Sequence, residues 1–371
     1  GIGLVIGAGL WGAAGAALLV SLRGDRLGRR RVLVTLAALS AGGGLAAATI
    51  ADPLALAVAA FAGMLNGQGR DRGAALVIEQ AVIPQIAGAE SMRTRAYAVY
   101  NLLQDVGHAL GALAAGLPTA LQSVLAMDAH ASFGAAIYAA AVLLALPAAL
   151  YLLLSPATES AIPATQLRLR PRSRSILWRI SSLFALDSIA GGFLGTALLS
   201  YFFFERFGVS EAVIGGLFFG ARLLNAGSHL AAAWLAGRIG LVNTMVFTHI
   251  PSSLLLASVA FAPNFWMAAL LFLLREGLVE MDVPTRQSYV MAVVDPAERT
   301  FASGVTHLVR LGGWAVGPAI AGVLMQGVGL AAPIFIGAGL KIAYDLLLYR
   351  EFRDVRPPEE ERAVRRRPAA D

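Results

Sequence analysis

The sequence contains no cysteine, which excludes a disulfide framework, a cysteine-ligated zinc site and a cysteine nucleophile. Charged residues are also scarce. They make up 14% of the 371 residues, against about 25% in a typical soluble domain, while hydrophobic residues make up 57%. Too few polar side chains remain to cover a water-facing surface, so a soluble enzyme is excluded. No nucleophile with its base and no set of metal ligands is recognisable, and we expect no catalytic residue, metal or cofactor.

Lysine is nearly absent. Lys341 is the only one, and Arg supplies the rest of a formal net charge of +6. A strongly basic chain can indicate nucleic-acid binding. Here, however, most Arg residues lie in short loops between apolar spans, as the positive-inside rule produces in membrane proteins. We therefore expect no nucleic-acid partner.

Apolar spans of membrane-crossing length fill the chain. We expect helices, because only helices and closed barrels satisfy their backbone in lipid, and these runs are longer than barrel strands and do not alternate. The predicted fold class is an all-α polytopic membrane protein. Its eleven spans lie at roughly 1–22, 32–50, 54–85, 95–120, 131–154, 177–204, 211–236, 242–262, 265–294, 300–325 and 330–350.

The connecting loops alternate in charge. One set is rich in Arg, and the other holds mainly Asp, Glu and His. Because cytoplasmic loops carry the excess of Lys and Arg, the alternation places the basic set and the C-terminus in the cytoplasm, with the chain in the inner (cytoplasmic) membrane. The N-terminus then lies outside, as expected if the chain starts one helix late.

Composition also divides the chain into domains. The longest loop, 155–176, is rich in Pro and Arg and has no apolar period, which is typical of a linker. It would separate an N-terminal bundle at 1–154, with five of six helices, from a six-helix C-terminal bundle at 177–350. The polar segment 351–371 is predicted to be a cytoplasmic tail.

An internal repeat supports two related bundles. The segment beginning Arg93-Thr94 recurs at Arg299-Thr300, and three spaced glycines coincide in the two copies. The turn Asp25-Arg26-Leu27-Gly28 likewise corresponds to Gly237-Arg238-Ile239-Gly240. Six helices separate the copies, so both keep the same direction in the membrane. Two sets of six require twelve helices, and the absent one is the first.

The loop SLRGDRLGRRR at 21–31 resembles the signature between helices two and three of the major facilitator superfamily. Asp25, Arg26, Gly28 and Arg30 match it, whereas Ser21 replaces its leading glycine. The resemblance implies a fold of two six-helix bundles related by pseudo-two-fold symmetry. It also implies that these four residues form a conformational motif on the cytoplasmic side, where the Asp holds the bundles together near a helix N-terminus. The glycine-rich fifth helix of proton-coupled exporters is matched only in part, because Ala112 occupies the proline position.

Charged and polar residues inside the spans are candidates for function, because such groups normally face protein or water rather than lipid. The proton-coupling candidates are Asp187, Asp105 and Glu79, since a carboxylate in a low-dielectric site can load and release a proton. The candidates for a solute cavity are Asn101, Gln104, His108, Arg222, Asn225, His307 and Arg310. Among these, the two Arg residues and His307 suit an anionic or polar solute.

The structural alternative is that these groups pair with one another and tie helices together. We assign this role to Arg72, Asp282 and Arg286, of which the last two are four residues apart. Lys341 and Asp345 have the same spacing and are expected to pair.

The predicted function is secondary active transport of a small organic solute, with proton-coupled efflux as the leading version. Proton symport for uptake, a channel, and a transport-inactive sensor or assembly protein remain alternatives. ATP drive is disfavoured, because the sequence has no phosphate-binding GKS/T loop. The expected partners are the lipid bilayer, the solute and protons, and the expected state is a monomer.

Overall fold

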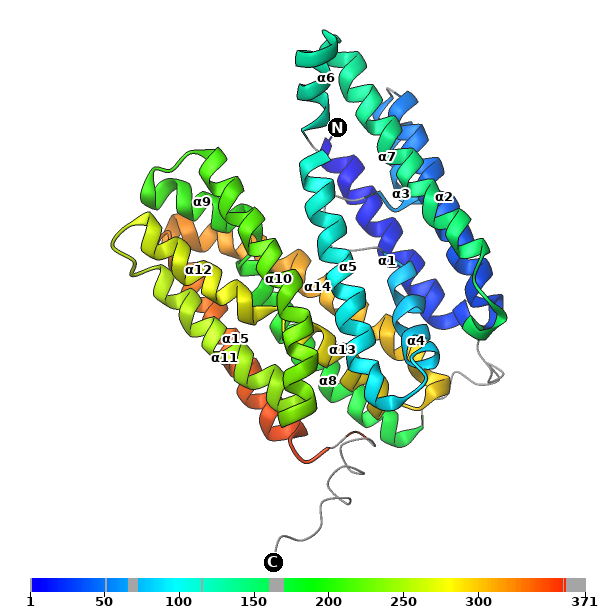
Figure 1. Cartoon of the computed structure of the whole chain (residues 1–371), viewed down its shortest axis with the longest axis vertical. Helices are drawn as coiled ribbons and strands as arrows, with labels where there is room; N and C mark the ends of the chain where they lie inside the picture. Colours follow the sequence, from blue (N-terminus) through cyan, green and yellow to red (C-terminus); the bar gives the residue numbers. More distant parts are fainter. Residues whose placement is uncertain are drawn as a thin grey trace, which may run out of the picture. The chain divides into compact units, whose positions relative to one another are not determined.

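The computed structural model describes residues 2–50, 52–65, 73–114, 116–159, 170–355 and 357, and every regular element among them is helical (Figure 1). The prediction of an all-α fold is therefore confirmed. The α-helices are α1 (Ile2–Leu27), α2 (Arg29–Thr49), α3 (Pro53–Gly63), α4 (Ala75–Ile86), α5 (Arg93–Ala114), α6 (Leu117–Leu125), α7 (Ala129–Leu152), α8 (Pro171–Phe193), α9 (Thr196–Phe207), α10 (Glu211–Ile239), α11 (Leu241–Val259), α12 (Phe265–Val279), α13 (Asp282–Val293), α14 (Arg299–Gly327) and α15 (Ala332–Phe352). Short 3-10 turns lie at Glu90–Met92, Pro156–Thr158 and Pro296–Glu298.

Four of the predicted spans contain a break and form two consecutive helices each: α3 with α4, α5 with α6, α8 with α9, and α12 with α13. Local chemistry explains several of these breaks. Pro118 lies in the first turn of α6, where its missing N–H costs nothing. Met64 ends α3 in the left-handed conformation, and Gly195 precedes α9.

Six helical segments of the described chain are long and apolar enough to cross a membrane, by length and composition. They are Arg29–Thr49, Ala129–Leu152, Pro171–Phe207, Leu241–Val259, Pro296–Gly327 and Ala332–Phe352. Several other spans fall short because a break divides them into shorter helices, such as Pro53–Gly63 and Ala75–Ile86.

The chain divides into two compact units. Unit 1 comprises Gly1–Ile86, Gly107–Arg168 and Ala297–Val305, and unit 2 comprises Ala87–Val106, Leu169–Pro296 and Thr306–Asp371. Each unit thus includes the first part of one helix, α5 or α14, whose remainder belongs to the other unit. The bundle boundaries at 154 and 177 stay predictions.

In unit 1, α2 packs against α3 and α7, and α1 packs against α3. Small residues allow close contact: a Cβ placed on Gly43 would lie 2.7 Å from the Cα of Gly63. Packing through small residues is how helices associate in lipid, where apolar side chains gain little by leaving their surroundings.

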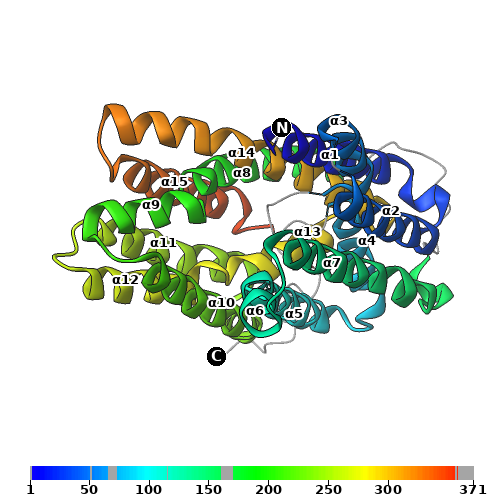
Figure 2. The same ribbon diagram turned by 90° about the horizontal axis from the view of Figure 1, so that it is seen from above.

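In unit 2, α11 packs against α12 and α15, and α15 also packs against α8 (Figure 2). An aromatic cluster joins α9 to α12, where the rings of Phe203 and Phe272 meet edge to face with centroids 5.6 Å apart. This packing fixes α8, α11, α13 and α15 around a polar interior.

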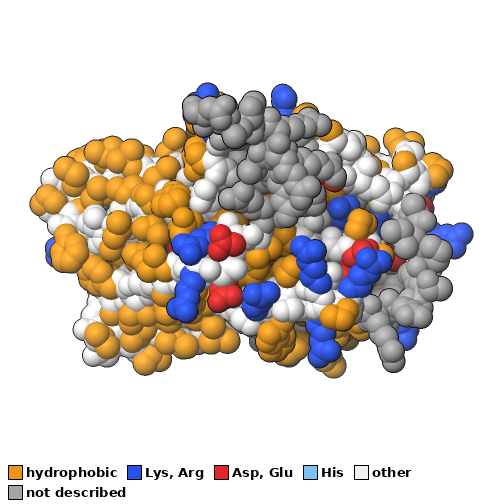
Figure 3. All heavy atoms as spheres, turned by 90° about the horizontal axis from the view of Figure 1, so that it is seen from below, with side chains coloured by type: hydrophobic (Ala, Val, Ile, Leu, Met, Phe, Trp, Pro, Cys, Tyr) orange, Lys and Arg blue, Asp and Glu red, His pale blue; other side chains and the backbone are white. Residues whose placement is uncertain are grey.

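The surface has the character of a lipid-facing protein. Large hydrophobic side chains are exposed on helices of both units, among them Trp11, Leu146, Phe247 and Trp266. The face seen in Figure 3 also carries Arg side chains, with hydrophobic side chains over much of the rest of it. Exposed apolar surface of this extent marks contact with a partner or a membrane, in agreement with a multi-pass membrane protein.

Candidate functional site

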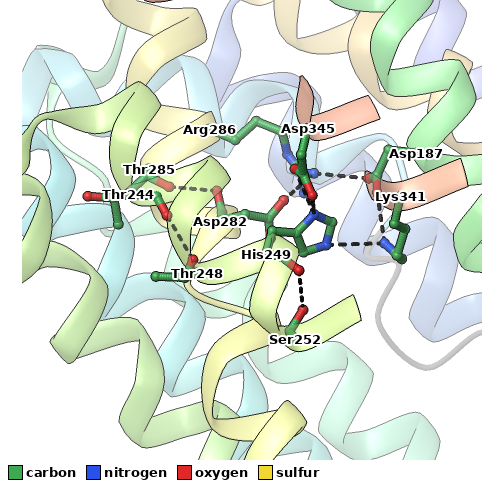
Figure 4. A network of polar contacts seen from close by, with 10 residues as sticks. All are labelled: Asp187, Thr244, Thr248, His249, Ser252, Asp282, Thr285, Arg286, Lys341 and Asp345. Carbon is green, nitrogen blue, oxygen red and sulfur yellow. Dashed lines mark hydrogen bonds and ion pairs between the residues drawn. The ribbon is translucent and has the colours of Figure 1, made fainter. Parts of the chain in front are cut away.

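A buried network of charged side chains connects four helices inside unit 2 (Figure 4). Its members are Asp187 on α8, His249 on α11, Asp282 and Arg286 on α13, and Lys341 and Asp345 on α15. All six are buried. Charges inside a membrane protein are costly and normally pair with each other, and the network meets this requirement.

Asp187 lies at the centre of the network. Its Oδ1 accepts a hydrogen bond from the Lys341 ammonium at 2.8 Å, and its Oδ2 accepts one from Arg286 at 3.2 Å. The same Arg286 nitrogen donates to Asp282 at 2.7 Å. Asp187 therefore joins α8 to α13 and α15, and permanent cations occupy both of its oxygens.

His249 joins the network from α11. Its Nδ1 lies 3.0 Å from both carboxylate oxygens of Asp345, and its Nε2 lies 3.3 Å from the Lys341 ammonium. An ammonium can only donate, so Nε2 accepts from it and Nδ1–H donates to Asp345. This assignment follows from the hydrogen bonds and corresponds to a neutral imidazole.

The expected pairing of Lys341 with Asp345 is wrong. Lys341 binds Asp187 and His249 instead, and Asp345 binds His249. Spacing of four residues places two side chains on one helix face. Each of them, however, finds a partner on a neighbouring helix.

The network and its surroundings are close to charge balance. Its six residues hold three carboxylates and two cationic side chains, and the guanidinium of Arg310 lies within electrostatic range of Asp187 and Asp282. Four hydroxyl groups around it donate to nearby backbone carbonyls, for example Ser252 to the carbonyl of His249 at 2.7 Å; the others are those of Thr244, Thr248 and Thr285. They stabilise the helices without changing this charge balance.

A second group of polar contacts in unit 2 joins the first part of α5 to α10 and α13. The carboxylate of Asp105 forms a hydrogen bond with Nε2 of His229 at 2.8 Å. The side-chain amide of Asn101 donates to the side chain of Gln287 at 2.7 Å. On α10, Asn225 donates to Glu276 at 3.0 Å, and Arg275 also pairs with this carboxylate. Asp105, Asn101 and Asn225 thus each bind a residue of a neighbouring helix, and their roles in proton coupling or solute binding stay predictions.

The other predicted cavity residues are distributed along the same helices. Gln104 and His108 are half-buried on α5, and Arg222 is half-buried on α10. His307 is buried on α14, and Arg310 stacks over the ring of Trp314, 4.8 Å from its centroid. Their role in binding a solute stays a prediction.

Two predicted residues lie elsewhere. Glu79 on α4 accepts a hydrogen bond from the hydroxyl of Tyr151 on α7, which joins two helices of unit 1. Arg72 lies outside the described residues, so its predicted contact with another helix stays a prediction. Among the residues that the structure describes, no group of three or more potential ligands could hold a metal ion.

The predicted motif at 21–31 forms the turn between α1 and α2 in unit 1. Asp25 pairs with Arg29 at 2.7 Å and accepts the hydroxyl of Thr300 at 2.9 Å. Gly28 has a φ of 88°, a region that favours glycine. The side chain of Arg30 donates to the carbonyl of Leu152 at 2.5 Å, and Arg26 is exposed.

Sequence reasoning missed two residues that stabilise this turn, Glu159 and Arg29. The carboxylate of Glu159 accepts the backbone N–H groups of Arg29 at 2.8 Å and Arg30 at 3.1 Å, so it caps the N-terminus of α2. The motif carboxylate Asp25 lies in the last turn of α1, and its Oδ1 binds the hydroxyl of Thr300 in the first turn of α14, so it lies near a helix N-terminus as expected; its role in holding the bundles together stays a prediction. The spacing of four between Asp25 and Arg29 was a usable signal, whereas nothing near Glu159 in sequence pointed to its partners.

Solved structures with this fold are transporters. The chain is similar to the human organic anion transporter MFSD10 (TETRAN), with a TM-score of 0.74 and 19% identity over 93% of this chain and 83% of that one. It is also similar to the proton:xylose symporter XylE, with a TM-score of 0.74 and 14% identity over 98% of this chain and 88% of that one.

Sequence comparison agrees with the structural likeness. The chain is 26% identical, over 94% of its length and 85% of the relative's, to the Saccharomyces cerevisiae protein "Uncharacterized membrane protein YJR124C". The family model described as "Major Facilitator Superfamily" matches residues 1–278 and 180–370. With the all-helical fold and the motif at Asp25, these matches lead to one conclusion: the chain belongs to the Major Facilitator Superfamily.

Proposed function

We propose that this protein is a proton-coupled secondary transporter of a small organic solute, working by alternating access in the inner membrane with its C-terminus in the cytoplasm. The observation that carries the proposal is the buried network of unit 2, in which one imidazole, that of His249, joins the ammonium of Lys341 to the carboxylate of Asp345. Export of the solute in exchange for an entering proton is the leading direction, and symport is the alternative.

His249 is the group through which a proton would change the network. In the neutral form its Nε2 accepts from Lys341, and its Nδ1–H donates to Asp345. A proton on Nε2 converts this acceptor into a donor and places two cations beside each other. Lys341 would then keep Asp187 as its remaining partner, so proton binding alters a contact between α11, α15 and α8.

The comparisons support the same proposal at the level of class. One structural neighbour is described as a proton:xylose symporter and another as a fucose:proton symporter, while a third is an organic anion transporter. These likenesses have low identity and carry the fold, so the coupling ion and the solute rest on the residues of this chain.

The test uses the full chain in liposomes that contain a pH-sensitive dye. Sugars, organic acids and organic cations are added one at a time, and the internal pH is followed together with solute uptake or release. We expect one class to move protons with it, and the sign of the pH change distinguishes exchange from symport. His249→Gln and Asp187→Asn should abolish most of the solute-linked proton movement.

A matched control is His130→Gln, because His130 is exposed at the start of α7. This variant should behave like the unmodified chain. Proton movement that survives both network substitutions would show that coupling lies elsewhere. Failure of every solute class to move would favour the transport-inactive alternative.

A further inference from the structure

Helices α8 and α14 of unit 2 touch each other backbone to backbone. A Cβ placed on Gly313 would lie 2.5 Å from the Cβ of Ser188, and one placed on Gly317 would lie 2.4 Å from the Cα of Gly192. No side chain fits at either glycine unless a helix moves, so these small residues allow the close approach. The contact fixes the register of α14 against α8 and therefore the position of every residue near it.

This register places Trp314 and Arg310 beside the buried network. The indole nitrogen of Trp314 lies 3.1 Å from where a Cβ of Gly191 would be, so the ring rests against α8. The guanidinium of Arg310 stacks over that ring, 4.8 Å from its centroid, in the geometry of a cation–π contact. The guanidinium also lies within electrostatic range of Asp187 and Asp282.

Arg310 differs from the other interior cations of unit 2 in what it binds. Lys341 and Arg286 each donate to Asp187, and Arg275 pairs with Glu276. Within the described residues, the guanidinium of Arg310 makes neither a hydrogen bond nor an ion pair. Both oxygens of Asp187 are already occupied by the other two cations, so this carboxylate cannot serve as its partner without displacing one of them.

A largely buried guanidinium without a hydrogen-bonding partner is unfavourable, because burial removes its hydration without replacing it. Stacking on Trp314 satisfies the face of the guanidinium but not its edge. Planar guanidinium edges bind carboxylate or phosphate oxygens through two parallel hydrogen bonds. Arg310 and Trp314 are both half-buried, so this edge is not sealed inside the protein.

We propose that the transported solute is a small organic anion whose carboxylate, or an equivalent oxyanion, binds the edge of the Arg310 guanidinium. The proposal rests on the proposed transport function and names its substrate class. Trp314 is a positioning residue in this arrangement, because it holds the guanidinium flat and offers an apolar surface beside it. A neutral sugar or an organic cation would offer the edge of the guanidinium no oxyanion.

The test measures binding to the purified full chain in lipid nanodiscs, without transport. The probes are benzoate and phenyl phosphate, with benzamide as the neutral analogue of benzoate. We expect the two anions to raise the thermal unfolding midpoint in a saturable way and benzamide to have little effect. Arg310→Gln should weaken anion binding by about 10- to 100-fold, as expected for lost charged hydrogen bonds.

Two variants separate binding from folding. Arg310→Lys keeps the charge but loses the planar fork, so its affinity should fall between those of the unmodified chain and Arg310→Gln. Arg206→Gln, at an exposed site near the end of α9, should bind the anions normally. Without ligand, Arg310→Gln should lose no more stability than the stacking on Trp314 contributes, about 2- to 30-fold in the unfolding equilibrium constant or about 0.5–2 kcal/mol, because within the described residues the guanidinium makes no hydrogen bond or ion pair.

Several outcomes would overturn the anion proposal: equal effects of benzoate and benzamide, no effect of either anion, or full anion binding by Arg310→Gln. If Arg310→Gln without ligand loses more unfolding free energy than the stacking on Trp314 contributes, Arg310 has a structural role instead. If liposomes couple protons to a neutral solute while no anion binds, the substrate class is wrong and the transport proposal survives. If anions bind through Arg310 but no solute crosses the membrane, the anion site survives and the transport proposal is wrong.

Discussion

The turn between α1 and α2 in unit 1 and the turn between α10 and α11 in unit 2 both contain a glycine with a positive φ. The residue before the second helix is a glycine in both, with a φ of 88° at Gly28 and 91° at Gly240. The side chains around them differ. Asp25 and Arg29 form a partly buried ion pair at the first turn, whereas Arg238 stacks on Trp234 at the second, 4.1 Å from the ring centroid.

This comparison separates what the internal repeat keeps from what it changes. The glycine conformation allows the chain to reverse at the same place in each copy, so it recurs. The charges have different positions. In unit 1 the ion pair of Asp25 lies at a helix end, while in unit 2 the network of Asp187 lies in the middle of the helices. The chemistry proposed for transport therefore belongs to unit 2.

The largest effect that we expect comes from removing the centre of the unit 2 network. Asp187→Ala leaves Lys341 and Arg286 short of one carboxylate inside the protein. Breaking a buried ion pair in this way costs about 3–5 kcal/mol of folding free energy. Thermal or denaturant unfolding of the purified chain in detergent checks this value.

The control for this substitution is Glu351→Ala, which removes an exposed carboxylate 3.4 Å from Arg179. Exposed pairs contribute about 0–1 kcal/mol, so this loss should be small. Similar losses for the two substitutions would mean that the interior charges of unit 2 do not hold its helices together.

The next effect tests the two turn glycines directly. Gly28→Ala and Gly240→Ala force a Cβ into a region of φ that only glycine adopts easily, at a cost of about 1–3 kcal/mol each. Because the two φ values are nearly the same, the two losses in unfolding free energy should be similar. Gly237→Ala is the control, since it lies inside α10 with open space around it and should be neutral or stabilising. Unequal losses at the two turns would contradict a common backbone role.

The sequence predicted the helices and the repeat better than the contacts. Long apolar spans identify membrane helices because lipid leaves few other solutions, and the glycine turn recurs because the backbone requires it. Asp187, by contrast, stands alone among apolar residues, and its partner Lys341 is 154 positions away. No local pattern connects two such residues.

Helical spacing was a partial guide to the site. It indicated the pair of Asp282 with Arg286, which the structure contains. It also suggested a pair of Lys341 with Asp345, which neighbouring helices replace with other partners. Spacing reports which side chains share a face, and only the packing of helices decides which of them meet. The transport roles assigned to these residues therefore stay predictions.

The smallest effect concerns the cap at the first turn. Glu159→Ala removes the carboxylate that binds the N–H groups of Arg29 and Arg30. Losing a cap and a favourable charge at a helix N-terminus costs about 0.5–2 kcal/mol. Glu159→Gln keeps an acceptor oxygen and loses the charge, so its loss in unfolding free energy should be smaller.

A second cap in unit 1 calibrates this measurement. Asp52 caps α3 by accepting the N–H of Ala55 at 2.8 Å, and it is exposed. Glu159 serves two N–H groups and comes from a segment 130 residues away, so its removal also loses one of the contacts that hold that segment against α2. We therefore expect Glu159→Ala to lower the unfolding free energy more than Asp52→Ala does. The opposite order would mean that Glu159 acts as an ordinary helix cap. The electrostatic stabilisation of the turn between α1 and α2 would then come from Asp25 and Arg29 alone.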